Sequence, residues 1–217
     1  MSEFLRRRVM MVDTQVRPSD VTKFPIIDAM LSVPRELYVP EAKREAAYMG
    51  ENLELVAGRV LLEARTLAKL LDALNILPSE LVLDLGAGLG YSTAIIARLA
   101  EAVIGVEADE SLAADAQRRL AEEGVDNAMV LKGPLDAGAA KHAPYDVITV
   151  QGGVERMPQA VLDQLKEGGR IAAVFMEGSL GVARIGHKAG GKVSWRFLFN
   201  ASAPVLPGFE KVRGFAL

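Results

Sequence analysis

The pattern of apolar and polar residues along the chain predicts strands that alternate with helices. Residues 81–85 form a short apolar run broken only by Asp84, which is typical of a buried parallel strand. Residues 86–90 then read as a glycine-rich turn. The next segment, which begins at Tyr91, has apolar residues at helical spacing, and residues 102–106 are a second apolar run. The order is therefore strand, glycine turn, helix and strand.

The same alternation resumes after residue 107. Asp109 is expected to cap a helix that runs through Leu120, and a second helix is expected to begin at Pro158 and to end at Gly168 and Gly169. Further strands are expected at residues 128–131, 145–150 and 170–175. Residues 182–185 and 193–199 alternate with a period of two around Gly190 and Gly191, which predicts an antiparallel hairpin. On the second strand of this hairpin Trp195, Phe197 and Phe199 share a face. We expect this face to pack in the core rather than to line an aromatic acceptor pocket.

Residues 1–57 read as helices with irregular connections. A first helix places Phe4, Val9 and Val16 on one face, so that Arg6–Arg8 are expected to be mostly solvated rather than a patch for an anionic partner. A second helix is expected over residues 21–31, and a third has leucines at positions 67, 70, 71 and 74. These elements predict a single α/β domain over residues 1–217. A helical cap (1–57) would precede a Rossmann-like core (58–217), whose mostly parallel sheet has helices on both faces and an antiparallel C-terminal hairpin.

Composition excludes several kinds of protein. With 217 residues, half of them hydrophobic, the chain is long enough for one sizeable core. A net charge of −3 gives no reason to expect nucleic-acid binding. The absence of cysteine excludes disulfides and thiolate sites, and two histidines are too few for a histidine metal cluster; His142 is expected in an exposed loop. Because no run approaches the length of a membrane span, we expect a cytoplasmic protein that contacts no membrane.

The glycine turn is the main candidate for chemistry. Its glycines, Gly86, Gly88 and Gly90, would let the backbone approach a ligand closely. Glu107 follows Gly86 by 21 positions (107 − 86), at the end of the next strand, where an acid can accept hydrogen bonds from a ribose. The dinucleotide fingerprint needs a third glycine where this chain has Tyr91, which disfavours an NAD site. A turn without a ligand is the other alternative.

The segment Asp84-Leu-Gly-Ala-Gly-Leu-Gly-Tyr91 resembles the cofactor loop of class I S-adenosylmethionine-dependent methyltransferases. The resemblance implies S-adenosyl-L-methionine as cofactor and S-adenosyl-L-homocysteine as product. It implies that the acid at position 84 lies near the methionine amino group, that the turn with Ala87 lines the methionine part, and that the acid at position 107 holds the ribose. Further cofactor contacts are then expected from Tyr91, Ala108, Gly133, Pro134 and Leu135. Where the family usually has Gly-Asp-Gly beside the adenine this chain has residues 133–136 (Gly-Pro-Leu-Asp), so the adenine edge is expected to rely on backbone groups or on Asp136. Gln151, just past the fourth strand, is expected either to meet the cofactor or acceptor, or to be satisfied by loop backbone.

A narrower resemblance involves the N-terminal region. Gln15-Val16, residues 28–40 (Asp-Ala-Met-Leu-Ser-Val-Pro-Arg-Glu-Leu-Tyr-Val-Pro) and Ala47-Tyr48 are similar to the signature of protein-L-isoaspartate O-methyltransferases. The similarity continues at residues 144–148 and 164–170 and covers about four fifths of the chain. It implies methylation of the free α-carboxylate of isoaspartyl residues in damaged proteins, which begins their repair. The expected partner is a protein or peptide with a free carboxylate.

The acceptor site is where the sequence departs from this family. The family has a Gln-Thr-Ile-Ser run near the transferred methyl, whereas this chain has Val60 and Leu62 at the hydroxyl positions. An arginine, Arg59 or Arg65, is a candidate to hold the acceptor carboxylate instead, unless both point to water. The departure leaves open a methyltransferase with a different acceptor, and also a non-catalytic relative that binds the cofactor or a partner.

Overall fold

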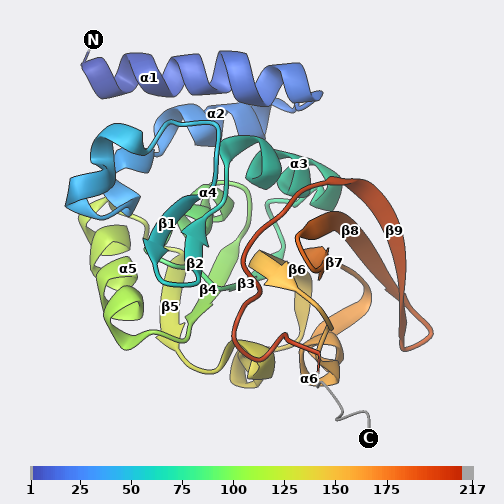
Figure 1. Cartoon of the computed structure of the whole chain (residues 1–217). Coiled ribbons are helices and arrows are strands. Elements are labelled where there is room, and N and C mark those ends of the chain that lie inside the picture. The colour runs from blue at the N-terminus through green and yellow to red at the C-terminus, as the bar shows by residue number, and fades with distance from the viewer. Residues whose placement is uncertain (1, 212–217) are drawn as a thin grey trace, which may run out of the picture.

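The computed structural model describes residues 2–211 and contains one large sheet with helices on both faces (Figure 1). The seven strands lie in the order β5-β4-β3-β6-β7-β8-β9. Strands β3 to β7 are parallel, and β8 and β9 close the sheet as an antiparallel hairpin, as predicted. The strands span β3 (Leu81–Leu85), β4 (Ala102–Glu107), β5 (Ala128–Lys132), β6 (Tyr145–Val154), β7 (Leu165–Glu177), β8 (Leu180–Ala189) and β9 (Lys192–Asn200).

The helices divide between two hydrophobic clusters, one on each face of the sheet. One cluster joins the N-terminal helices to those that flank β3 and β4, and the other lies under a short helix and two 3-10 turns. The first group comprises α1 (Glu3–Met11), α2 (Phe24–Ser32), α3 (Ala64–Leu74), α4 (Tyr91–Ala97) and α5 (Glu110–Glu122); the second comprises α6 (Gln159–Asp163), η5 (Leu135–Ala137) and η6 (Ala140–His142). The first cluster spans the chain from Met11 to Ala203, so the N-terminal cap and the sheet share one core.

The N-terminal cap differs from its prediction in two ways. After α1 come the turns η1 (Val12–Val16), η2 (Arg17–Ser19), η3 (Arg35–Tyr38) and η4 (Glu41–Ala46), followed by a hairpin of β1 (Leu53–Val56) and β2 (Arg59–Leu61) in a region expected to lack strands. In addition, Arg8 was expected in solvent but is buried, because Glu36 and Tyr48 bind its guanidinium. Packing between segments distant in sequence, which local periodicity does not report, decided both outcomes.

The prediction that the three aromatic residues of β9 share a core face is wrong. Phe197 is 64% exposed, so Trp195, Phe197 and Phe199 do not form the expected core face. The pairing of β8 with β9 shifts between Ala183↔Phe199 and Arg184↔Phe197, which leaves Leu198 as an extra residue in β9. A bulge of this kind reverses the alternation of side chains beyond it. Trp195 therefore packs against Phe175 on one face, and Phe199 against Lys69 on the other.

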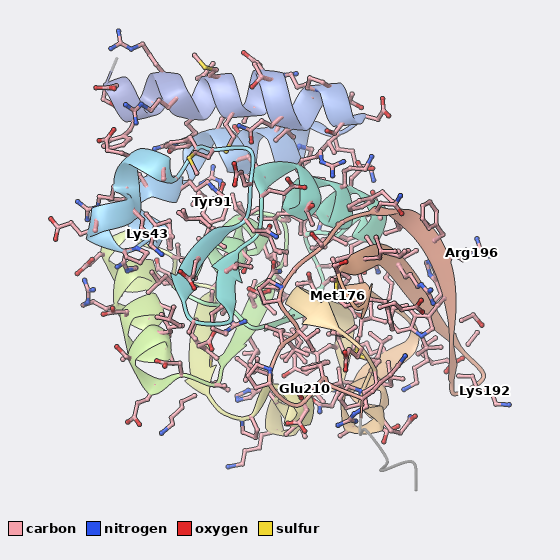
Figure 2. The ribbon with its side chains drawn as sticks, in the orientation of Figure 1. Lys43, Tyr91, Met176, Lys192, Arg196 and Glu210 are labelled. Carbon is pink, nitrogen blue, oxygen red and sulfur yellow. The ribbon has the colours of Figure 1, made fainter. Side chains whose placement is uncertain are left out.

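Strands β6 and β7 are longer than predicted. Strand β6 continues through Gly152 and Gly153 to Val154 after an irregular pairing, and β7 begins at Leu165, before the glycines expected to end a helix. Figure 2 shows the long β8–β9 hairpin extending to one side, with Lys192 at its tip and Arg196 on its outer edge. His142 lies on η6 and is exposed, as expected.

Candidate functional site

The glycine turn lies where the order of the parallel strands reverses. Strand β3 is flanked by β4 on one side and β6 on the other, so the turn after Leu85 opens at the switch point where open α/β sheets bind ligands. Gly86, Gly88 and Gly90 all have positive φ (80°, 57° and 95°), a conformation that side-chain-bearing residues rarely adopt. Backbone hydrogen bonds from Gly86 and Ala87 to the Val106 carbonyl hold the turn against β4. Three glycines and the contact with β4 therefore fix the conformation of the turn.

Asp84, the acid that precedes the turn, is completely buried and turned inward. Its Oδ2 accepts hydrogen bonds from the hydroxyls of Ser92 and Thr93, each at 2.7 Å, and its Oδ1 accepts one from Nε2 of Gln151 at 2.8 Å. Burial raises the pKa of Asp84, and these three hydrogen bonds act in the opposite direction. Gln151 was expected to meet a ligand or loop backbone, but its amide nitrogen is bound by Asp84 and by Thr149.

Glu107, the expected ribose acid, ends β4 with its carboxylate beside the glycine turn. Oε2 accepts from the backbone N–H of Gly88 at 2.7 Å, and Oε1 accepts from the N–H groups of Ala108 and Asp109 at 2.9 and 3.2 Å. The residue is fully buried. The spacing of 21 residues therefore placed this carboxylate at the turn correctly.

Arg59 forms a buried ion pair with Glu107. Its Nη2 lies 2.6 Å from Oε2 and its Nε 3.3 Å from Oε1, and the arginine side chain is 6% exposed. The acceptor role considered for Arg59 is thus not the one its side chain performs in this structure. Of its neighbours, Leu62 is buried in the core and Val60 is partly buried against it. Arg65 is half-exposed and pairs with Glu63.

The remaining predicted cofactor residues lie around this centre. Gly133 donates its N–H to the Glu107 carbonyl, and with Pro134 it borders a pocket of about 320 Å³ that continues along η6. Leu135 is buried. Tyr91 points away, into the N-terminal cap, where its ring packs against Tyr38 and under the guanidinium of Arg35. Only the Tyr91 backbone, at the start of α4, is left at the turn; Figure 2 shows its side chain deep beneath the cap.

Two side chains that sequence reasoning did not single out also meet the turn. An atom at the Cβ position of Gly86 would lie 3.2 Å from Cδ1 of Leu206, and one at that of Gly88 would lie 2.7 Å from Cδ1 of Leu55. The segment after β9 folds back over the sheet, and its Leu206 reaches the turn (Figure 1). No local motif marks Leu55 or Leu206, because each reaches the turn through tertiary packing alone.

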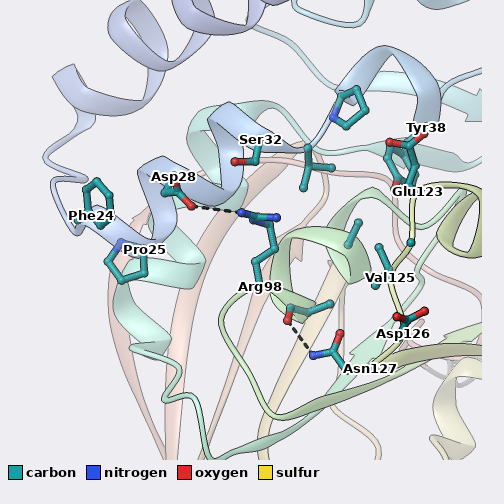
Figure 3. A pocket seen from close by; sticks show the side chains of 15 residues that line it. Phe24, Pro25, Asp28, Ser32, Tyr38, Arg98, Glu123, Val125, Asp126 and Asn127 are labelled. Atoms are coloured by element: carbon teal, nitrogen blue, oxygen red, sulfur yellow. Dashed lines mark hydrogen bonds and ion pairs between the residues drawn. The ribbon is translucent and has the colours of Figure 1, made fainter.

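Two larger pockets have no residue of the glycine turn in their linings. One, of about 740 Å³, is lined by Arg65, Asn52 and the ends of β8 and β9. The other, of about 630 Å³, lies between α2 and the segments that precede β4 and β5, and is shown in Figure 3 with Arg98 reaching across to Asp28. This pocket adjoins the amino ends of the parallel strands, whereas the glycine turn lies at their carboxyl ends. Within residues 2–211, every helix falls short of the length and apolar character that a membrane crossing requires.

Comparison with known proteins identifies relatives over most of the chain. A family profile described as protein-L-isoaspartate(D-aspartate) O-methyltransferase matches residues 8–199. The protein-L-isoaspartate O-methyltransferase of Syntrophus aciditrophicus is 36% identical over 171 residues, which cover 79% of this chain and 78% of that protein. Protein-L-isoaspartate O-methyltransferase 2 of Pelobacter propionicus is 34% identical over 185 residues, covering 83% and 82%.

Solved structures have the same fold. A protein-L-isoaspartate O-methyltransferase superposes with a TM-score of 0.79 at 22% identity, covering 94% of this chain and 65% of that one. A Plasmodium falciparum protein in complex with S-adenosyl-L-homocysteine also gives 0.79, at 19% identity, covering 95% and 99%. The extent of the family match confirms the resemblance carried by the N-terminal signature and the glycine turn. The chain belongs to the protein-L-isoaspartate O-methyltransferase family.

Proposed function

We propose that this protein transfers a methyl group from S-adenosylmethionine to the free carboxylate of isoaspartyl residues in damaged proteins. The family assignment confirms the predicted enzyme class and the predicted cofactor. The observation that carries the proposal is the carboxylate of Glu107 held against a glycine turn at the switch point of the sheet. A cytoplasmic location and a protein partner stay predictions from the sequence.

The backbone of the site fits the cofactor. Gly86, Gly88 and Gly90 have no side chains of their own to obstruct a ligand, and Glu107 offers a carboxylate to which ribose hydroxyls can donate. Ala108, Gly133 and Pro134 would border the adenine. The side chains of Arg59 and Leu206, however, lie in this cradle and would have to leave it. The cofactor supplies the methyl group, activated on a positively charged sulfur.

The chain needs no general base for this reaction. A carboxylate acceptor is already ionised at neutral pH, so the protein has to orient it and exclude water. The pocket of about 740 Å³ is lined by Asn52 and Ser202, which belong to the two segments whose leucines contact the turn. Arg65 also lines this pocket, and its half-exposed guanidinium would hold the acceptor carboxylate there. This arginine would compensate for the hydroxyls that are absent at Val60 and Leu62.

The test is methyl transfer from labelled S-adenosylmethionine to a short isoaspartyl peptide, with the normal aspartyl peptide as control. Base-labile methyl ester formed on the isoaspartyl peptide alone would support the proposal. An Arg65→Gln variant is then expected to raise the KM for peptide with little change in kcat, because it removes a group that holds the acceptor in the ground state and the transition state alike.

A second candidate is a methyltransferase with a different acceptor. It is favoured by Leu62, whose apolar side chain is buried in the core at a position where the family has a hydroxyl. Labelling of other carboxylate acceptors but not of the isoaspartyl peptide would select this alternative. Cofactor binding without any transfer would instead indicate a non-catalytic relative.

A further inference from the structure

The ion pair between Arg59 and Glu107 closes the cofactor site from inside. The guanidinium binds both oxygens of a carboxylate that also accepts three backbone N–H groups. A carboxylate offers about four lone-pair positions, so no position is left for ribose hydroxyls. Nη2 of Arg59 also lies only 3.0 Å from where a Cβ atom of Gly86 would be, which is the space that a closely bound ligand needs.

Leu206 fills the other side of the same space. An atom at the Cβ position of Gly152 would lie 2.5 Å from its Cδ2, so this leucine bridges the gap between Gly152 on β6 and Gly86 on the turn. Leu206 is almost fully buried. Three glycines that would cradle a ligand, including Gly88 under Leu55, are therefore covered by side chains of the chain itself.

Both covering segments are joined to each other at the rim. Arg59 and Leu55 belong to the β1–β2 hairpin, a separate two-stranded sheet, and Leu206 belongs to the segment after β9. Asn52 connects them: its Nδ2 donates to the Ser202 carbonyl at 2.7 Å, while its Oδ1 accepts from the Glu63 N–H. The C-terminal segment is attached to β6 by hydrogen bonds between Gly153 and residues 204 and 206. The hairpin and this segment are therefore linked to each other through Asn52, and the movement of one involves the other.

The closed arrangement leaves one polar group unsatisfied. Nη1 of Arg59 is buried and has no hydrogen-bond partner among the described residues. An unpaired buried donor costs free energy, so the closed state is not an optimal packing for this arginine. A ligand that releases Arg59 towards solvent would remove that cost.

We propose that Arg59 and Leu206 form an internal plug, and that the cofactor binds only when the guanidinium leaves Glu107. This inference rests on the proposed function. Because only the open fraction of the protein is competent to bind, the plug lowers the apparent affinity by that fraction. Arg59 and the ribose hydroxyls compete for one carboxylate, so removal of the arginine raises the affinity.

The test is isothermal titration calorimetry of S-adenosyl-L-homocysteine with the full-length wild type, Arg59→Met and Leu206→Ala. We expect each variant to bind about tenfold more tightly than the wild type. Leu206→Ala preserves the ion pair, so it tests the plug even where loss of Arg59 harms folding, and circular dichroism checks that each protein is folded. The matched control is Arg98→Met, which removes an exposed arginine at the opposite edge of the sheet, and its affinity should equal that of the wild type.

The outcomes separate the plug from the function. Tighter binding by either folded variant supports the plug. Equal affinities for the wild type and both variants would overturn it while leaving cofactor binding, and so the proposed function, in place. If no protein of the set binds S-adenosyl-L-homocysteine, both the plug and the proposed cofactor are wrong.

Discussion

At the residue scale, Glu107 places a carboxylate in the interior of the protein. It is ionisable and fully buried, and Arg59 is the charge that compensates for it at 2.6 Å. We predict that Glu107→Gln lowers the free energy of unfolding by about 3–5 kcal/mol, because it leaves the buried guanidinium without a counter-charge. Urea denaturation measures the change.

The control for this prediction is Glu110→Gln. Glu110 forms an ion pair of the same length with Lys132, but its side chain is 78% exposed. Exposed pairs contribute about 0–1 kcal/mol, so the control should unfold close to the wild type. A Glu107→Gln variant as stable as the control would show that Arg59 has another way to satisfy its charge.

The two members of this pair differ in how far the sequence could predict them. Glu107 was placed correctly because strand, turn and helix lengths fix where the second strand of such a unit ends. The role of Arg59 was missed because it depends on a contact across 48 residues, between a hairpin and the sheet. Periodicity describes neighbours along one element, and it contains no information about which segments meet in space.

At the element scale, Arg170 fastens β7 to the end of α3. Its guanidinium binds both carboxylate oxygens of Glu80, each at 2.7 Å, and the carbonyls of Leu74 and Asn75. Burial alone would raise the pKa of Glu80, but hydrogen bonds from Arg170 and from the Leu77 N–H outweigh it, so the pKa of Glu80 is lowered.

The lowered pKa of Glu80 determines how this ion pair makes the stability of the protein depend on pH. A carboxyl group with a lowered pKa in the folded protein stabilises it above the pKa of the unfolded chain, and this stability is lost as the pH falls through the folded value. We therefore predict that the melting temperature of the wild type falls more steeply than that of Glu80→Gln between pH 6 and pH 3. Parallel curves in thermal unfolding would contradict a role for the pair.

The bulge in β9 leads to a second prediction at this scale, about the stability that two aromatic side chains contribute. Trp195 packs edge-on against Phe175 with ring centroids 4.7 Å apart, whereas Phe197 is mostly exposed. Trp195→Ala should therefore cost about 2 kcal/mol of stability, and Phe197→Ala less than about 0.5 kcal/mol. Equal costs in guanidinium denaturation would indicate that the three aromatic residues do share a buried face.

Elements with a strong local sequence signal were predicted correctly, and elements without one were not. The strand over residues 81–85 and the helix capped by Asp109 match the structure, because short apolar runs and capping side chains act locally. The β1–β2 hairpin and the bulge at Leu198 could not be predicted, since the first is too short for a period and the second is a shift in pairing. Both are set by tertiary contacts.

At the scale of the whole molecule, the N-terminal cap and the sheet belong to one hydrophobic cluster that reaches from Met11 to Ala203. Within the cap, Arg8 on α1 donates to Tyr48 and to Glu36. Tyr91 on α4 packs against Tyr38 of the cap. The cap is therefore expected to have no stability of its own once the sheet unfolds, as the single domain inferred from the sequence requires.

This continuity can be tested with two probes at opposite ends of the fold. The single tryptophan, Trp195, reports on the β8–β9 hairpin, and circular dichroism at 222 nm is dominated by the helices, which include α1 and α2 of the cap. We predict that fluorescence and circular dichroism give one coincident urea transition, because a shared core unfolds as one cooperative unit. An earlier transition in circular dichroism would show that the cap unfolds first and forms a separate unit.

The variant Tyr48→Phe tests the same coupling by a change within the cap. It removes a hydroxyl that links Arg8 and Glu36, and it should shift both transitions equally, by about 1–2 kcal/mol, if the cap and the sheet are coupled.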